Sequence, residues 1–129
     1  MKSLLLTILL STFALSDISI YISHNNQIQK VSQKELANLY LKKTDNIKGF
    51  KVTPIDSKNQ KLFQEFYAKV VNKTPSQLRA YWIKQVYRGN TQPPKKLSKN
   101  AIQQALKKGE QIITYDVNLK TGKVLLTIK

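Results

Sequence analysis

The central segment of this chain, residues 66–95, reads FYAKVVNKTPSQLRAYWIKQVYRGNTQPPK and predicts two helices separated by a turn. Phe66 and Val70 continue an apolar stripe that begins at Leu62 and Phe63, at the spacing of a helix. A second stripe at helical spacing is formed by Leu78, Tyr81, Trp82 and Val86. We assign these stripes to the protein core, against the alternative that their aromatic rings stack on nucleic-acid bases. Nucleic acid is therefore not an expected partner.

The residues around the second stripe set the ends of its helix. Thr74 can accept a hydrogen bond from the amide of Gln77, and the Gln77 side chain can reach back to Thr74, as in a capping box. Pro75 suits the first helical position. Gly89, followed by the proline pair at 93–94, predicts the end of the helix.

Outside this segment, the pattern of branched residues predicts strands at residues 18–22, 50–55, 112–117 and 123–128. Helices are expected to start at Ser32, where Glu35 completes a second capping box, and at Ser98. The loop at 118–122 suits a hairpin between the last two strands, and the polar residues 89–99 suit a surface connection. This order predicts an α/β fold, a mixed sheet flanked by helices, with right-handed crossovers in the early connections.

The segments FYAKVVNKTPSQLRAYW (66–82) and YRGNTQPPK (87–95) resemble the small periplasmic-binding-protein-like proteins labelled phosphate ABC transporter substrate-binding protein. The resemblance extends more loosely to DISIYIS (17–23), VSQKELANLYLKKT (31–44) and FKVTPID (50–56). It implies a single lobe of the type II periplasmic-binding-protein-like fold, in a protein that serves phosphate uptake. Phe63 is a departure, because many relatives carry an Arg there that would suit bidentate contact with an oxyanion. EQIITYDV (110–117) also matches the family's Gly-Ala-Ile-Gly-Tyr-Val-like strand only in part.

The first residues, MKSLLLTILLSTFALS (1–16), have the composition of a signal peptide, with Lys2 before a short apolar run and small residues at Ala14 and Ser16. We expect cleavage after Ser16, export to the periplasm and a single domain at 17–129. The alternative is an uncleaved amphipathic anchor or a buried first helix. No later segment approaches the roughly 20 apolar residues of a membrane span. The absence of Cys excludes a lipoprotein anchor, disulfides and thiolate metal ligands.

The charge of the chain is strongly positive, with 22 Lys and Arg residues against 7 Asp and Glu residues, a net charge of +15. Lys2 is the only charged residue among the first sixteen, so cleavage would leave +14. Two interpretations remain open. The lysines are scattered and can simply keep exposed faces soluble, or they can form a basic face for phosphate, anionic lipid, cell-wall polymers or an acidic partner.

Ligands of open α/β sheets bind beyond the carboxyl ends of the strands, where helix N-termini present free amides. This rule selects Asn25 after the first strand and Ser57 after the second as candidate anion ligands, with Lys58 and Lys61 as the nearby cations. The alternative for Ser57 is that it only caps its own helix. A lone lobe would hold an anion weakly, because water is not excluded from one side of the site.

Catalysis is the least supported class of function. His24 is the only histidine and the four glycines form no phosphate-binding loop, so no metal site, cofactor or catalytic set is expected. The first hypothesis is an exported solute-binding module that takes phosphate or a related oxyanion for an uptake system. The second is a non-enzymatic envelope interaction module, a receptor lobe that has lost ligand capture and binds another envelope protein. Self-association that rebuilds a two-lobed cleft lies between them.

Overall fold

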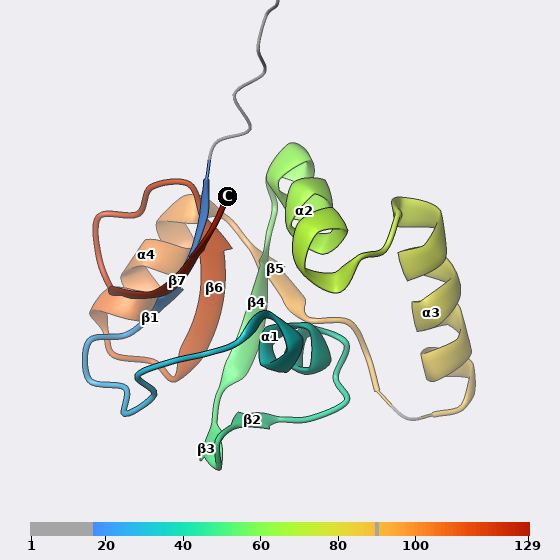
Figure 1. Cartoon of the computed structure of the whole chain (residues 1–129), viewed down its shortest axis with the longest axis horizontal. Coiled ribbons are helices and arrows are strands. Elements are labelled where there is room, and N and C mark those ends of the chain that lie inside the picture. The colour runs from blue at the N-terminus through green and yellow to red at the C-terminus, as the bar shows by residue number, and fades with distance from the viewer. Residues whose placement is uncertain (1–16, 90) are drawn as a thin grey trace, which may run out of the picture.

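A computed structural model describes residues 17–89 and 91–129, so the expected signal peptide and its cleavage site lie outside the described residues. The elements in chain order are β1 (Ile18–Ile22), α1 (Gln33–Tyr40), β2 (Asn46–Ile47), β3 (Phe50–Lys51), β4 (Thr53–Ser57), α2 (Gln60–Phe66), the π-helical turn η1 (Tyr67–Val71), α3 (Pro75–Tyr87), β5 (Lys95–Leu97), α4 (Lys99–Lys107), β6 (Ile112–Asp116) and β7 (Lys123–Ile128). Figure 1 shows α3 at one end of the molecule and α4 near the other.

The sheet is mixed, with the strand order β5-β4-β6-β1-β7. β4 runs parallel to both β5 and β6, whereas β1 runs antiparallel to both β6 and β7. β2 and β3 form a separate two-stranded ribbon. The predicted fold class, a mixed sheet flanked by helices, is confirmed.

The two faces of the sheet bury different apolar clusters because side chains alternate along each strand. On β1, Ile20 and Ile22 belong to the larger cluster, which α1, α2, η1 and α3 cover, whereas Tyr21 belongs to the smaller one. The smaller cluster is completed on the other face by α4, through Ile102 and Leu106. The sheet is therefore the middle layer between two layers of helices.

The helices begin where the sequence predicts, and each predicted capping residue makes its hydrogen bond. The Ser32 hydroxyl accepts from the amide of Glu35 at 3.1 Å, and the Glu35 carboxylate accepts from the amide of Ser32 at 2.9 Å. Thr74 and Gln77 make the same reciprocal pair at 3.2 and 3.0 Å. The Ser98 hydroxyl accepts from an amide in the first turn of α4 at 3.2 Å. These signals could be read from the sequence because both partners lie within three residues of each other.

Two predicted connections are wrong. β6 and β7 do not form a hairpin, because β1 lies between them and pairs with both. The loop 117–122 instead crosses β1, with Leu119 buried in the smaller cluster and its amide donating to the Tyr21 hydroxyl at 3.1 Å. Gly122 ends this loop at φ +89°, where a Cβ atom would approach the carbonyl oxygen of Ile22 to 2.8 Å. The step from β1 to β4 is also no parallel crossover, since β1 runs antiparallel to β6 and β6 parallel to β4.

Two local predictions also need correction. Residues 95–97, expected in a surface connection, form strand β5 and pair with β4. Val86, expected in the core, is half exposed because α3 packs on the rest of the molecule through Leu78, Tyr81 and Trp82 near its middle. The end of α3 extends beyond that contact.

Candidate functional site

The most unusual group in the protein is a buried carboxylate at the end of β4. Asp56 is 1% exposed, although it carries a side chain that normally stays in water. The hydroxyl of Tyr115 donates to its Oδ1 and the hydroxyl of Tyr67 donates to its Oδ2, both at 2.8 Å. Each carboxylate oxygen thus has a partner, which offsets the cost of removing it from water.

Packed aromatic rings fix these two hydroxyl groups. Phe66 stacks on Tyr115 with ring centres 3.8 Å apart and an angle of 5° between the planes. Tyr40 contacts the edge of Phe66, and its hydroxyl lies 3.0 Å from the carbonyl oxygens of both Ile55 and Ile113. The cluster therefore joins α1, α2, η1 and two neighbouring strands around Asp56, and it holds the carboxylate in one orientation.

The surroundings of Asp56 favour its neutral form. Burial raises the pKa of Asp56 to about 7, although the hydrogen bonds from Tyr115 and Tyr67 and the charges of Lys96 and Lys42 act to lower it. Burial and the charge of Asp56 raise the pKa of both tyrosines above the ordinary value, so their hydroxyl groups remain protonated donors. The carboxyl group thus exchanges its proton near neutral pH.

A turn with basic side chains follows Asp56 and leads into α2. The Ser57 amide donates to the Tyr115 hydroxyl at 3.2 Å, and the Ser57 hydroxyl accepts from the Asn59 amide at 3.0 Å. The Lys58 amide donates to the carbonyl of Leu97 in β5 at 3.0 Å, which leaves the Lys58 side chain at the exposed rim. Lys61 lines a shallow hollow of about 190 Å³ together with Asn59 and residues 62, 65 and 117.

Lys96 adds a third cation next to this turn. It lies opposite Asp56 in the β4–β5 pairing, and its Nζ sits 4.1 Å from the centre of the Phe63 ring. A cation over an aromatic face is attracted by the ring quadrupole. Phe63 therefore holds a positive charge close to the rim, although it carries no charge of its own.

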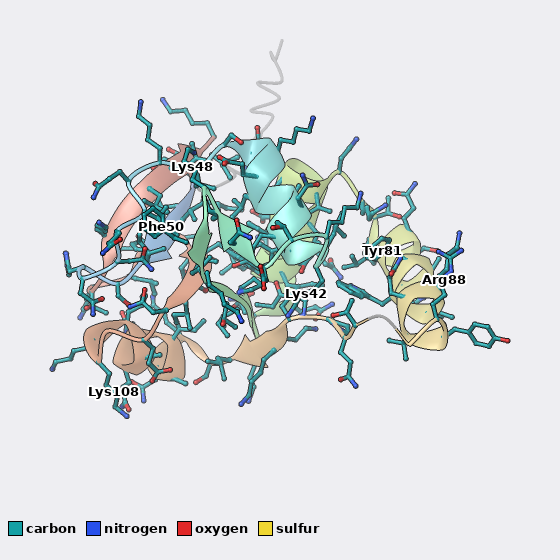
Figure 2. All side chains as sticks on the ribbon, turned by 90° about the horizontal axis from the view of Figure 1, so that it is seen from below. Lys42, Lys48, Phe50, Tyr81, Arg88 and Lys108 are labelled. Atoms are coloured by element: carbon teal, nitrogen blue, oxygen red, sulfur yellow. The ribbon has the colours of Figure 1, made fainter. Side chains whose placement is uncertain are left out.

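Asn25 lies at the other end of the sheet. Its side-chain nitrogen donates to the Gly109 carbonyl at 3.4 Å, and it lines a hollow of about 390 Å³ with His24, Lys107 and Lys108. Figure 2 shows Lys108 far from Arg88 at the tip of α3. The structure brings Ser57, Lys58 and Lys61 together but does not bring Asn25 to them. The reason is the direction of β1, whose carboxyl end lies beside the start of β6, whereas β4 ends beside the end of β6.

No motif in the sequence identifies Asp56 and its two tyrosines as a cluster. A usable signal was present, because an aspartate directly after Ile55 in a buried strand needs donors from elsewhere in the chain. The sequence did not identify the donors, since Tyr67 and Tyr115 are 11 and 59 residues away. Within the described ranges, the structure holds no group of three or more His, Cys, Asp or Glu side chains able to bind a metal ion. No helix in those ranges has the length and hydropathy to cross a bilayer.

The sequence matches no family profile and no curated protein. The structure is similar to the crystal structure of an ABC-type phosphate transport receptor from Vibrio cholerae, with a TM-score of 0.53 and 11% sequence identity. The match covers 88% of this chain and 47% of the receptor. The chain thus spans about half the length of that protein, and the likeness shows a shared fold, that of one lobe of a binding protein.

Proposed function

We propose that this protein is an exported, non-enzymatic solute-binding module of the periplasm that takes phosphate or a related oxyanion for an uptake system. The likeness to a phosphate transport receptor supports a solute-binding role. The seat of the anion is the turn after β4, where Ser57 and Lys58 follow the buried Asp56 and Lys61 lies close by. Asn25 is not part of this seat, because it lies at the opposite end of the sheet.

The observation that carries this proposal is the position of Lys96 over Phe63. Phe63 stands where the resemblance implies an oxyanion-binding Arg. The lysine on β5 restores a positive charge at this place, since the Phe63 ring holds its ammonium group. An ammonium group acts as a point charge and not as a planar fork, so we expect weaker selection by anion shape than an Arg would give.

Calorimetry tests this seat. We expect heat on titration with phosphate that does not appear with chloride at the same ionic strength. Lys96→Met should weaken phosphate binding about tenfold, the usual value of one charged hydrogen bond. Lys107→Met removes the same charge at the far end of the sheet and should leave binding unchanged. The absence of heat at millimolar phosphate, or equal loss in both variants, would exclude the seat at β4.

A second candidate function is an envelope interaction module that has lost ligand capture. The exposed end of α3 favours it, because Ile83, Val86 and Tyr87 present apolar surface to solvent there. In this case the phosphate titration gives no heat and the protein acts through a surface contact.

A further inference from the structure

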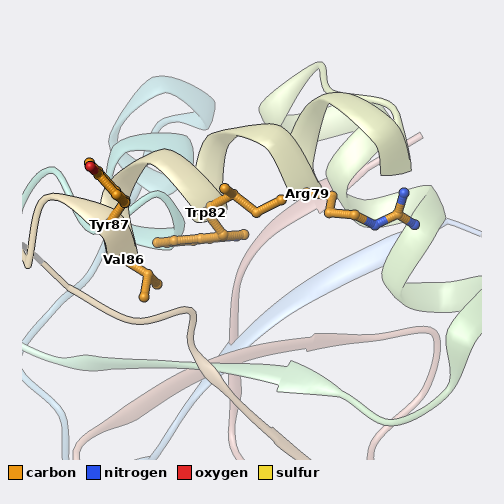
Figure 3. Close-up of a pocket in the computed structure, with 5 residues that line it drawn as sticks. Arg79, Trp82, Val86 and Tyr87 are labelled. Carbon is orange, nitrogen blue, oxygen red and sulfur yellow. The ribbon is translucent and has the colours of Figure 1, made fainter.

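The exposed face of α3 is an apolar stripe without a partner among the described residues. Ile83 is 64% exposed, Val86 50% and Tyr87 90%. Together with Arg79 and Trp82 they line a hollow of about 560 Å³ to which α3 alone contributes. Their spacing of three and four residues places them along one side of the helix. Figure 3 shows Arg79, Trp82 and Val86 along α3, with Tyr87 near its end.

The adjacent side of the same helix is anchored in the protein, and Trp82, which is 9% exposed, lies between the two sides. The Tyr81 hydroxyl donates to the carbonyl of Leu41 at 2.7 Å, and Leu78 is buried in the larger cluster. Figure 2 shows Tyr81 directed towards the body of the molecule and Arg88 directed outward. The exposed stripe is therefore presented by a rigid helix at one end of the molecule.

The charges on α3 and on the segments before and after it in the chain are all positive. From Phe66 to Gly109 the sequence contains ten Lys and Arg residues and no Asp or Glu. On α3 itself, Arg79 and Lys84 are exposed, and Arg88 follows at its C-terminal cap. The occupant of this surface must therefore be both apolar and anionic.

We propose that this face of α3 docks onto an anionic lipid bilayer. A helix that lies in the bilayer interface presents large apolar side chains to the acyl chains while Lys and Arg reach the headgroups, and α3 presents Ile83, Val86 and Tyr87 with Arg79 beside them. Tyr and Trp favour the level of the lipid headgroups. The positive charge of Arg79, Lys84 and Arg88 matches an anionic surface, and each basic residue near such a surface adds to the attraction.

Two other occupants fit the observations less well. A second copy of this chain would bring Arg79 and Arg88 against their equivalents, and no acidic residue on α3 could pair with them. An acidic helix of a partner protein would need a groove with two walls, whereas a single helix lines this hollow. A planar bilayer needs no second wall.

Vesicle binding tests the proposal with residues 17–129, which contain every helix and strand of the structure and both apolar clusters. We expect binding to vesicles of equal parts phosphatidylglycerol and phosphatidylcholine, and little binding to phosphatidylcholine alone. Trp82 is the only tryptophan and lines the hollow, so quenching of its emission by vesicles with brominated acyl chains reports contact between α3 and lipid. The anion-seat variant Lys96→Met should still show this quenching, which separates the two proposals.

A matched pair of double variants makes the test specific. Ile83→Ser with Tyr87→Ser should weaken binding about tenfold or more and abolish the quenching of Trp82, because the apolar contact is lost. Phe50→Ser with Val124→Ser removes two other exposed apolar side chains and should leave both readouts unchanged. Circular dichroism confirms that each variant is folded.

Several outcomes would overturn the proposal. These are the absence of binding, equal loss in both double variants, or binding without quenching of Trp82 by brominated acyl chains, which would indicate adhesion by charge alone. A dimer in lipid-free sedimentation that disappears with Ile83→Ser and Tyr87→Ser would instead assign this face to a second copy.

Discussion

The buried carboxyl group of Asp56 makes the stability of the protein depend on pH in an unusual direction. Its native pKa of about 7 lies above the value of about 4 expected in the unfolded chain. Between these values the folded protein binds more protons than the unfolded protein. The contribution of Asp56 to stability is therefore fully present below about pH 4 and is lost as the pH rises through about 7.

Asp56→Asn should remove this pH dependence. The difference in unfolding free energy between the variant and the natural protein should shift in favour of the variant from pH 4 to pH 8, by up to about 1.4 kcal/mol per pH unit. Urea unfolding at each pH measures it. Asp45→Asn, at a carboxylate whose side chain is 71% exposed, is the matched control and should give a nearly constant difference. A constant difference for Asp56→Asn as well would show that this carboxyl does not titrate in this range.

Residue-level features could be predicted from the sequence only when their partners are close along the chain. Ser32 with Glu35 and Thr74 with Gln77 were predicted correctly for this reason. The bonds from Tyr67 and Tyr115 to Asp56 depend on the packing of η1 and β6 against β4, which no local pattern encodes. The binding roles of Asn25, Ser57, Lys58 and Lys61 stay predictions.

At the scale of single elements, α3 depends on the capping box at its start. Thr74 and Gln77 satisfy two amides that the helix cannot pair internally, and Pro75 fixes the first turn. Tyr81 and Trp82 pack the middle of the helix against the core, while its last turn extends into solvent. The start of this helix is therefore the part that its own sequence stabilises most.

Thr74→Ala should lower the free energy of unfolding by about 1 kcal/mol, because the hydroxyl acceptor for the Gln77 amide is lost. Chemical denaturation measures this change. Ser76→Ala removes an exposed hydroxyl in the same turn and should change stability little. An equal loss from both substitutions would indicate a general effect of this turn and not of the capping box.

Helices and strands with a strong apolar periodicity could be predicted from the sequence, whereas segments with a weak pattern could not. Residues 95–97 are a strand only because β4 offers them a parallel partner, since Lys95 and Lys96 give no apolar alternation. Gly122 in the loop 118–122 favours a hairpin turn, but the insertion of β1 between the flanking strands depends on contacts far apart in the chain. Turn residues predict a change of direction without identifying the strand that will pair.

At the scale of the whole molecule, the net charge of +15 opposes compaction. The ion pairs seen among the described residues are few, with Lys48 bound to Glu35 at 2.9 Å and Lys51 near Asp45 at 4.0 Å. Most of the positively charged side chains therefore lack an acidic partner and repel one another through solvent. Dissolved salt screens this repulsion.

Added salt should stabilise the protein. Raising NaCl from about 10 mM to about 0.15 M shortens the screening length from about 30 to about 8 Å. We expect the melting temperature to rise by roughly 4 °C, the shift that about 1 kcal/mol gives in a domain of this size. Lys107→Glu with Lys108→Glu lowers the net charge and should reduce this rise. A melting temperature that does not rise with salt would contradict the repulsion.

The fold class was predictable because strands and helices alternate along the chain, and the likeness to one lobe of a receptor agrees with it. The position of the candidate site was only partly predictable. The rule that ligands lie at the carboxyl ends of strands requires strand directions, and the antiparallel course of β1 separates Asn25 from Ser57. Strand direction is set by the whole sheet and cannot be seen in the residues around either site.

The position of β1 between β6 and β7 governs the order in which the protein can fold. The first strand of the described chain pairs only with the last two, so its hydrogen bonds wait until residues 112–128 have emerged from the ribosome. Until then, the apolar side chains of β1 have no sheet to enter and are free to bind a chaperone or to aggregate. Closure of so long a loop is also slow. The sheet therefore closes only at the end of synthesis, and the new chain exposes the apolar side chains of β1 for as long as its last two strands are missing.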